Sequence, residues 1–345
     1  MASKLDCQNF LDQKLQEITS PDTINKYYVL ANDFVNNLLA KQKEIISSNK
    51  TSPFSCIYGV MLSGCVQKQL VIPSISCGYL VFLYHLKERH FDNSNVEPFE
   101  KKHKDILKWM KQSIEKMKNE FDKDEIRILR YSRSSLRIEW KGVEYHIAIA
   151  WTFWKRQYCA FDYTQNNVHV YKFLAEQLQI AASDLVEEAP IHQRHIRKTN
   201  ARWKKFLEKN MSSSLSLLRV YYMRGESIGK NVRSAIMFLK MWQHYQMKGK
   251  QHLSNNSLEI MCVHLFDRLK KKSQCDTPIF SFDIIAEFFH SIMQFKKCAS
   301  KKILPMEWPY QKNKFQCLIK SKHIHKYKQT FNSGDIVILD NLIIR

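Results

Sequence analysis

Glycine and proline are scarce in this chain of 345 residues, which contains only eight of each. Few tight turns are therefore expected, and the composition favours a helix-rich protein. Long apolar runs are also missing, because the longest, near residues 78–86, is far too short to span a bilayer. The N-terminus from Met1 to Asp6 is polar overall and has no apolar run, which argues against a signal peptide. These absences predict a soluble protein of the cytoplasm or the nucleus, with no membrane partner.

Cysteine is present but shows no pairing pattern. Nine cysteines are scattered along the chain, an odd number, and no C-x-x-C motif occurs. This favours reduced thiols and argues against a disulfide framework. His192 and His195 form an H-x-x-H motif, but no neighbouring cysteine or carboxylate completes a set of zinc ligands. We therefore expect no metal site there.

Acidic residues are in deficit. Lysine and arginine number 54 against 33 aspartates and glutamates, which gives a formal net charge of +21. An excess of this size predicts an acidic partner, and nucleic acid is the first candidate. The alternative is a solvated lysine-rich surface with no such partner. Apolar residues make up 44% of the chain, enough for a substantial core, and the length suggests two domains.

The periodicity of apolar residues changes along the chain. It predicts a helix over residues 22–45 after the start signal Pro21-Asp22-Thr23, and an amphipathic helix over residues 101–121. Three short strands are expected at 126–130, 135–141 and 143–151, with Gly142 forming the turn between the last two. Beyond residue 165 helices are expected at 168–182, 193–210, 213–223, 229–247, 255–271 and 281–295, with one last strand at 336–339. The sequence thus predicts an α/β (α+β) protein whose second half is helical.

A buried strand at Leu80–Leu83 follows two stretches of small residues. Ser63-Gly64-Cys65 stands before it, and Ser74–Tyr79 leads directly into it. A small-residue turn, about ten residues, a polar pair and an apolar strand form the layout of the nucleotidyltransferase active site. In that superfamily two carboxylates spaced i and i+2 lie on one face of the strand and hold two divalent metal ions.

Further segments occur in the same order as in one branch of that superfamily. They are Leu11–Leu15 with the helix to Lys43, Gly142–Ile147, Ile236–Trp242, Lys248-Gly249-Lys250 with Ser257–Ile260, and Val337–Asp340. The ordered set resembles the 2′-5′-oligoadenylate synthetase and cyclic GMP-AMP synthase-like nucleotidyltransferase family. The resemblance implies a two-lobed, polymerase-beta-like fold, with an α/β lobe and N-terminal spine helix at 1–165 and a helical lobe at 166–345. It also implies that Lys240 approaches nucleotide phosphates.

The sequence departs from the family at the positions of its catalytic acids and of its phosphate-binding turn. The resemblance places the three acids at Ser76, Gly78 and His146, and none of these residues is a carboxylate. One histidine does not replace three acids for Mg²⁺, which prefers oxygen ligands. The phosphate-binding turn at Ser63, Gly64 and Cys65 is altered too, because Val60-Met61-Leu62 and Val66 make it apolar. We therefore expect no catalytic residue and no cofactor, with Mg²⁺ and ATP used only if the protein is active after all.

The alternative is that the register is misassigned. Glu144 is two residues from His146 and is therefore on the same face of its strand. Asp92 follows the strand at Leu80–Leu83 too late, and Asp162 lies in a different element. None of these three residues restores an i, i+2 pair of acids on the strand at Leu80–Leu83.

A basic helix face offers a site for nucleic acid. Lys198, Arg202, Lys205 and Lys209 are spaced i, i+4, i+7 and i+11, which aligns them on one face. In the resembled family double-stranded RNA lies across the face opposite the active site and contacts this helix and the end of the N-terminal helix, here Lys41 and Lys43. Such RNA is recognised by shape and phosphate contacts, so no base-specific motif is needed. The competing interpretation is a solvated lysine face.

Three functions remain open from the sequence. The first is an oligoadenylate synthetase-like protein without activity, a pseudoenzyme that binds double-stranded RNA. The second is an active template-independent nucleotidyltransferase that makes 2′-5′-oligoadenylate or a cyclic dinucleotide from ATP or GTP with Mg²⁺. The third is a structural subunit that dimerises with itself or a protein partner and does not bind RNA.

Overall fold

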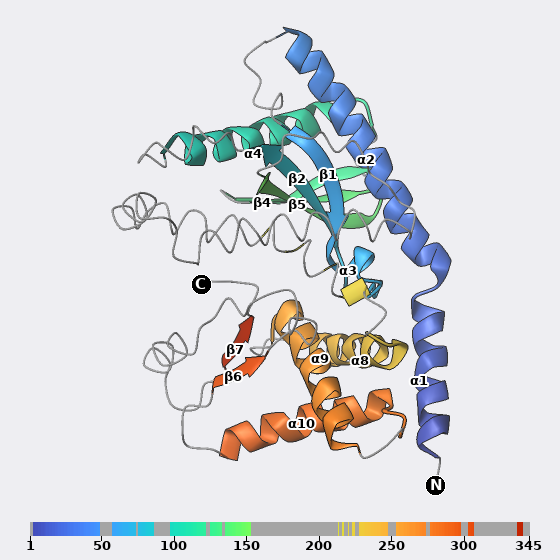
Figure 1. The fold of residues 1–345 in the computed structure, drawn as a ribbon. Coiled ribbons are helices and arrows are strands. Elements are labelled where there is room, and N and C mark those ends of the chain that lie inside the picture. Colours follow the sequence, from blue (N-terminus) through green and yellow to red (C-terminus); the bar gives the residue numbers. More distant parts are fainter. Residues whose placement is uncertain are drawn as a thin grey trace, which may run out of the picture. The chain divides into compact units, whose positions relative to one another are not determined.

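The structure is a computed structural model that describes most of the N-terminal half and part of the C-terminal half (Figure 1). The described residues are 3–48, 57–73, 75–85, 97–121, 125–132, 135–152, 213, 216, 220, 223–224, 228–247, 253–273, 277–297, 303–306 and 337–340. The chain divides into two compact units. Pro21–Val71 and Ser76–Arg224 form the sheet unit, and Met1–Ser20, Ile72–Ile75 and Gly225–Arg345 form the helical unit.

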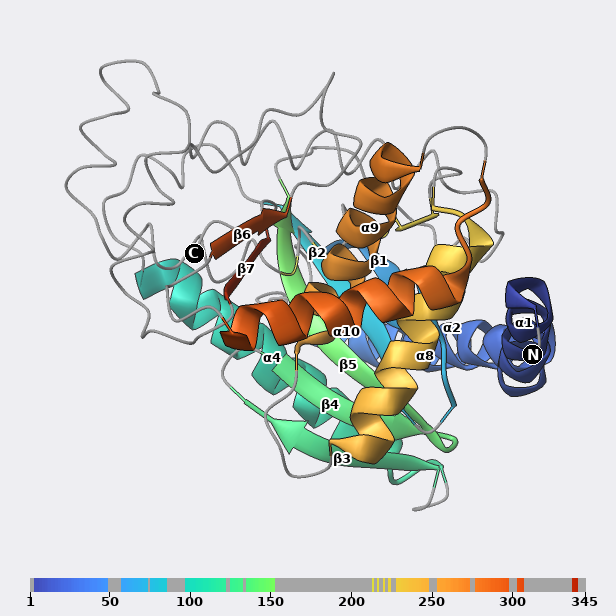
Figure 2. The same ribbon diagram turned by 90° about the horizontal axis from the view of Figure 1, so that it is seen from below.

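The sheet unit is built on five strands in the order β1-β2-β5-β4-β3. Strands β2 and β5 are parallel, whereas the pairs β1–β2, β5–β4 and β4–β3 are antiparallel. Figure 2 shows β5 between β2 and β4. The strands are β1 (Ile57–Ser63), β2 (Gly78–His85), β3 (Ile126–Tyr131), β4 (Ser135–Trp140) and β5 (Val143–Thr152).

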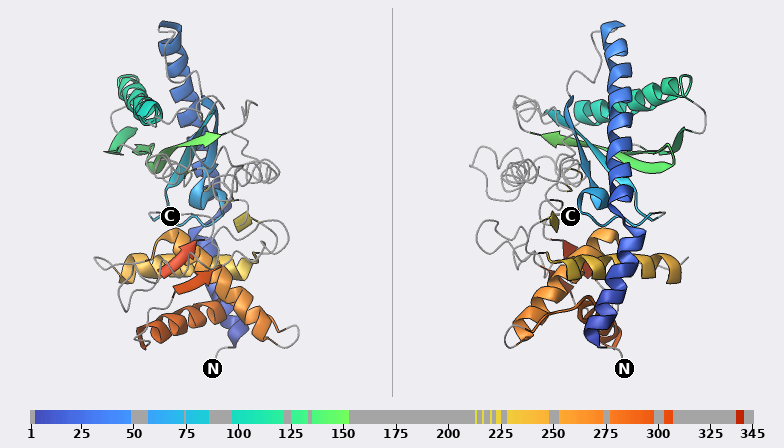
Figure 3. Two further views of the ribbon diagram at one scale, coloured as in Figure 1. Left: turned by 60° about the vertical axis from the view of Figure 1, so that its left-hand side comes forward. Right: turned by 90° about the vertical axis from the view of Figure 1, so that its right-hand side faces the viewer.

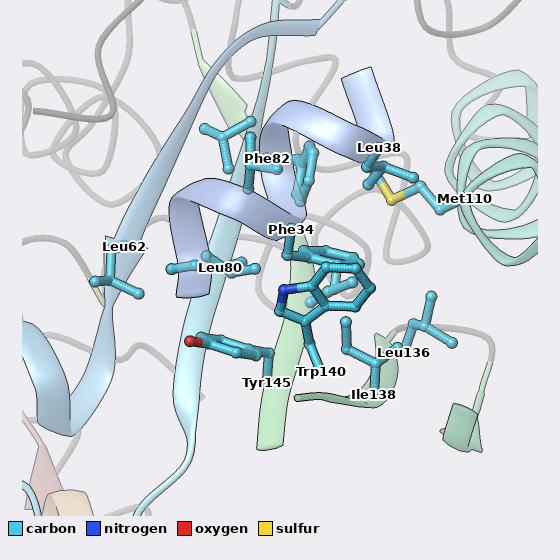
Figure 4. Close-up of a cluster of buried hydrophobic side chains, with 14 of the residues drawn as sticks. Phe34, Leu38, Leu62, Leu80, Phe82, Met110, Leu136, Ile138, Trp140 and Tyr145 are labelled. Atoms are coloured by element: carbon cyan, nitrogen blue, oxygen red, sulfur yellow. The ribbon is translucent and has the colours of Figure 1, made fainter. Parts of the chain in front are cut away.

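Two helices, α2 (Pro21–Ser48) and α4 (Glu97–Met117), pack against the sheet unit's core. Alternate residues of each strand point to the same side of a sheet, so every second residue of β2 and β5 joins this core. Figure 4 shows Phe34 and Leu38 of α2 among the side chains that the strands contribute. The ring centroids of Phe34 and Trp140 are 5.8 Å apart. The core of the sheet unit therefore lies between α2, α4 and one face of the sheet.

Two turns of the sheet unit have backbone conformations that favour glycine. Lys141 and Gly142 both have positive φ, +47° and +77°, as a two-residue hairpin loop requires. Gly64 has φ +74° after β1, and a side chain there would come within 2.9 Å of the Tyr79 Cβ atom. Gly64 is thus required both for its backbone conformation and for the close approach of β2.

The helical unit contains α1 (Lys4–Ile18), α8 (Lys230–Gln246), α9 (Asn255–Lys272) and α10 (Ser281–Lys297) (Figure 3). Helix α1 begins at a capping box formed by Ser3 and Asp6. It is joined to the other helices by an ion pair between Lys4 and Asp283 at 2.7 Å and by one between Lys230 and Asp12 at 2.7 Å. The parallel strands β6 (Ile303–Met306) and β7 (Val337–Asp340) complete the described part of this unit.

The α/β class expected from the sequence is confirmed, with a five-stranded sheet and helices. The helices expected near 22–45, 101–121, 229–247, 255–271 and 281–295 are present, as are the three strands around Gly142. The helices expected at 168–182 and 193–210 lie outside the described residues. The observed division differs from a boundary at residue 165, because α1 belongs to the helical unit.

The described segments contain helices that can be checked for membrane-spanning length and four cysteines. None of the helices that the structure describes is long and apolar enough to cross a membrane. Cys7, Cys65, Cys77 and Cys262, the cysteines within the described segments, are free thiols.

Candidate functional site

The register between β2 and β5 decides which side chains share a face. Tyr79 lies opposite His146, and Gly78 lies opposite Tyr145. Because side chains alternate along a strand, Tyr79 and His146 point to one side of the sheet and Gly78 and Tyr145 to the other. The rings of Tyr79 and His146 meet edge to face, with centroids 4.8 Å apart. The Gly78 side is the side of the hydrophobic core, to which Tyr145 belongs.

A polar face is formed by Cys77, Tyr79, Arg137, Glu144 and His146. Arg137 on β4 lies opposite His146, and Glu144 is two residues before His146 on β5, so all three share a side. The Arg137 Nε atom is 3.3 Å from the Glu144 Oε1 atom. The Cys77 thiol is close enough to Glu144 and Arg137 to interact electrostatically with both. This polar face is the candidate site.

Burial keeps two of these groups uncharged. Burial, followed by the nearby charge of Arg137, lowers the pKa of His146 to about 4, so its imidazole is neutral at physiological pH. Its Nε2 atom is buried and makes no hydrogen bond within the described part of the chain. Burial, followed by the effects of Cys65 and Glu144, raises the pKa of Cys77 to about 11. Cys77 is therefore a thiol, which is a weak nucleophile and a poor metal ligand.

Position 78 has no room for a side chain. A Cβ atom built on Gly78 would lie 2.4 Å from Cδ1 and 2.5 Å from Cε1 of Tyr145. The Tyr145 ring is fixed there, because its hydroxyl donates a hydrogen bond of 2.8 Å to the Tyr27 carbonyl oxygen on α2. The space that a carboxylate at position 78 would need is thus filled by an aromatic ring on the core side.

Ser76 is also held on the core side. Its carbonyl oxygen accepts a hydrogen bond of 3.1 Å from the Tyr27 hydroxyl, and its own hydroxyl lies 3.5 Å from the Leu70 carbonyl oxygen. The structure therefore does not bring Ser76, Gly78 and His146 together on one face. The i, i+2 pair that accompanies His146 is Cys77 and Tyr79, one residue further along the chain.

Alternation along β2 agrees with this placement. Leu80 and Phe82 lie in the core cluster, so Gly78, at the same parity, faces the core too.

Carboxylates on the polar face are few and are paired with arginine. Glu144 faces Arg137, and Glu139, which lies opposite Glu144 across β4 and β5, accepts a hydrogen bond of 3.1 Å from Arg127 Nε. Within the segments that the structure describes, no group of three or more His, Cys, Asp or Glu residues is placed to hold a metal ion.

The turn before β2 is short and tied to its surroundings. Helix α3 (Gly64–Gln67) is a single turn, and Val66 in it is fully buried. Gln67 accepts a hydrogen bond from the Tyr28 hydroxyl. The Ser63 hydroxyl lies 3.3 Å from the Ser216 hydroxyl. These contacts belong to the packing of the sheet unit.

Lys240 lies in the helical unit and is buried. Its ammonium donates a hydrogen bond of 2.8 Å to Glu259, and the two side chains are 2% and 1% exposed. In this arrangement the charge of Lys240 is neutralised inside the protein. Its contact with nucleotide phosphates stays a prediction, and it would require the ion pair with Glu259 to open.

The residues predicted to bind RNA, and the H-x-x-H motif, lie only partly within the described segments. Lys41 and Lys43 lie in the C-terminal turns of α2, whose side chains there are not described. The basic helix with Lys198, Arg202, Lys205 and Lys209 falls outside the described residues, as do His192 and His195. The RNA-binding assignment of these residues stays a prediction.

No protein-family model and no curated protein matches this chain. Among solved structures, the chain is similar to CdnC of E. coli MS115-1 in a complex with HORMA-deltaN, at 10% identity and a TM-score of 0.45, over 92% of this chain and 81% of that one. It is also similar to CdnC of E. coli MS115-1 with ATP, at 9% identity and a TM-score of 0.47, over 91% and 80%. Likeness at this level does not establish a shared family or activity.

Proposed function

We propose that this protein is a nucleotidyltransferase-like pseudoenzyme that binds double-stranded RNA. The observation that carries the first part is the composition of the polar face. The position opposite His146 is occupied by Tyr79, and the residue two before Tyr79 is Cys77. The place of a strand-borne carboxylate pair is thus taken by a thiol and a phenol.

The chemistry of nucleotidyl transfer explains why this composition matters. The in-line displacement at phosphorus depends on two metal ions that share carboxylate ligands. Two carboxylates lie on the polar side of the described sheet, Glu144, which is engaged by Arg137, and Glu139, which is engaged by Arg127. His146 is neutral and offers a nitrogen, whereas Mg²⁺ prefers oxygen ligands. Two carboxylates already paired with arginines and one imidazole do not replace three acids around two metal ions.

Shifting the register by one residue does not restore the site. In the original assignment the second acid falls at Gly78, where Tyr145 fills the space of a side chain. In the shifted assignment the acids fall at Cys77 and Tyr79. Neither alternative supplies a carboxylate pair, which favours loss of activity over misalignment.

The RNA-binding part of the proposal is supported by charge. The net charge of +21 predicts an acidic partner, and the basic face predicted for residues 193–210 has the spacing needed to follow phosphates. Duplex RNA is recognised through shape, phosphates and 2′-hydroxyl groups, which agrees with a protein that has no base-reading motif.

The catalytic half is tested by incubation with ATP, GTP, Mg²⁺ or Mn²⁺ and duplex RNA, followed by chromatographic analysis of products. We expect no oligonucleotide and no cyclic dinucleotide. Product that forms with Mg²⁺ and disappears when the metal is chelated would overturn the proposal and establish the active alternative. Calorimetric titration with ATP should show weak binding that is insensitive to Mg²⁺, because Lys240 is already paired with Glu259.

The RNA half is tested with two charge-reversed variants of the full chain. One replaces Lys198, Arg202, Lys205 and Lys209 by Glu, and the control replaces Lys320, Lys322, Lys326 and Lys328 by Glu. The first should lose affinity for duplex RNA and the control should lose much less. Equal losses would mean diffuse electrostatic binding, and no loss in either would point to a protein partner instead.

A further inference from the structure

The outward side of α4 carries a row of lysines that we call the lysine stripe: Lys101, Lys104, Lys108 and Lys111. At about 100° per residue these four positions fall within about one quarter of the helix circumference. Lys101, Lys104 and Lys108 are exposed and Lys111 is half-buried. The opposite side of the helix is anchored in the core by fully buried apolar residues: Ile106, Leu107, Met110, Ile114 and Met117.

The stripe keeps an excess of positive charge, although the half-buried Asp105 stands four residues after Lys101 and three before Lys108. Lys111 pairs with Glu115 at 3.3 Å, at one end of the stripe. Within the described segments no ion pair engages Lys101, Lys104 or Lys108. Lysines three and four residues apart on a helix repel one another, so the row costs the isolated protein stability. A polyanion along the helix would remove this repulsion.

The neighbours of the stripe suit a nucleic acid. The Lys111 ammonium lies 5.4 Å from the ring centroid of Tyr131 on β3, and that residue is 43% exposed. An exposed aromatic ring next to a cationic row can stack on a base or a ribose while lysines bind phosphates. Helix α4 packs against α2 through its opposite, buried side, where Met110 lies close to Leu38 (Figure 4).

We infer that the lysine stripe of α4 binds the phosphate backbone of one strand of an RNA duplex. This inference rests on the proposed RNA binding and extends it to a surface of the sheet unit. The stripe runs about 15 Å from Lys101 to Lys111, at a rise of 1.5 Å per residue. It would add a contact on α4 to the one predicted at Lys41 and Lys43 of α2.

The test measures binding of the full chain to a duplex RNA of about 20 base pairs as a function of salt concentration. The stripe variant is Lys101→Gln, Lys104→Gln and Lys108→Gln, which removes three charges and keeps good helix formers. A matched control removes three exposed lysines from other helices: Lys14→Gln, Lys26→Gln and Lys270→Gln. Circular dichroism and thermal melts verify that both variants are folded.

We expect the stripe variant to bind at least about tenfold more weakly at 0.1 M salt, with a log–log salt slope smaller by about 2 to 3, since each phosphate contact contributes about 0.9. The control should keep the wild-type slope. If the wild type binds and the stripe variant matches the control, the stripe assignment is overturned while the proposed function stands. If the wild type does not bind duplex RNA at all, both the proposed function and this inference are overturned.

Discussion

The two faces of the sheet differ most where β2 and β5 begin. On the core face Leu80, Phe82, Tyr145 and Ile147 are all fully buried. On the other face Tyr79, Glu144 and His146 are only partly buried, whereas Val81 and Ala148, further along the same face, are buried. Each large apolar side chain on the core face contributes about 1.5–3 kcal/mol through burial, whereas an exposed ion pair contributes about 0–1 kcal/mol.

This difference shows how a fold and its chemistry can separate. The core face specifies the sheet and tolerates little change, because interiors are closely packed. The polar face adds little to stability, so its residues are free to change without loss of the fold. A chain that keeps the first and alters the second retains a nucleotidyltransferase-like arrangement of strands while losing the ligands for metal ions, which is our proposal here.

The largest loss of stability is expected at Trp140, a fully buried residue on the core face of β4. Trp140→Ala should lower the free energy of unfolding by about 3–5 kcal/mol, because the ring packs against Phe34 and Phe121 and leaves a cavity. Urea denaturation followed by circular dichroism measures the change. Trp140→Phe is the control and should cost less, since most of the ring volume remains. A loss below about 1 kcal/mol for the alanine variant would contradict the division into two faces.

The second test concerns the tightest contact between β2 and β5. Gly78→Ala should cost about 1–3 kcal/mol, because the new methyl group meets the Tyr145 ring at 2.4 Å. Adding Tyr145→Leu should remove part of that cost, and a double-mutant cycle measures the coupling. Gly229→Ala is the control, since nothing lies within 4 Å of a Cβ atom there. Additive effects of the two substitutions would show that Tyr145 does not fill the space at position 78.

Much of the sheet unit could be predicted from the sequence because its signals are local. The periodicity of α2 and the hairpin at Gly142 both depend on residues close in the chain. No separate strand was predicted for β1 or for β6. Strand β6 has only four residues, and both strands pair with a strand that follows after an intervening segment.

The candidate site was harder to predict because register depends on pairing between distant segments. The order of small and apolar residues located the site near Ser63-Gly64-Cys65 and β2, but it did not fix which side chains of β2 accompany His146 on β5. Lys240 shows the same limit. Its position before Trp242 matched a family pattern, whereas its burial against Glu259 follows from the packing of α8 on α9.

The third test uses the pKa of His146, which burial lowers to about 4 from a usual value of about 6.5. Between these values the unfolded chain binds the proton and the folded protein does not, so the free energy of unfolding falls as pH decreases from 6.5 to 4. Because the ring is only half-buried, we expect this group to contribute about 1 kcal/mol. His146→Asn should flatten the stability profile over this pH range. An unchanged profile would show that the imidazole titrates in the folded protein as it does in water.

The smallest effect is expected at the ion pair between Arg137 and Glu144, whose side chains are 44% and 35% exposed. Arg137→Ala should change the free energy of unfolding by less than about 1 kcal/mol, because an exposed pair gains little in water and loses side-chain entropy. The informative measurement is therefore the pKa of His146 by NMR titration. The charge of Arg137 helps to keep that pKa low, so the variant should raise it, whereas Arg127→Ala, which removes the other arginine paired with a glutamate on this face, should change it less. If the two variants gave the same pKa for His146, the polar face would behave as scattered surface charge. A selective rise in Arg137→Ala would show that Arg137 and His146 interact as the register between β4 and β5 requires.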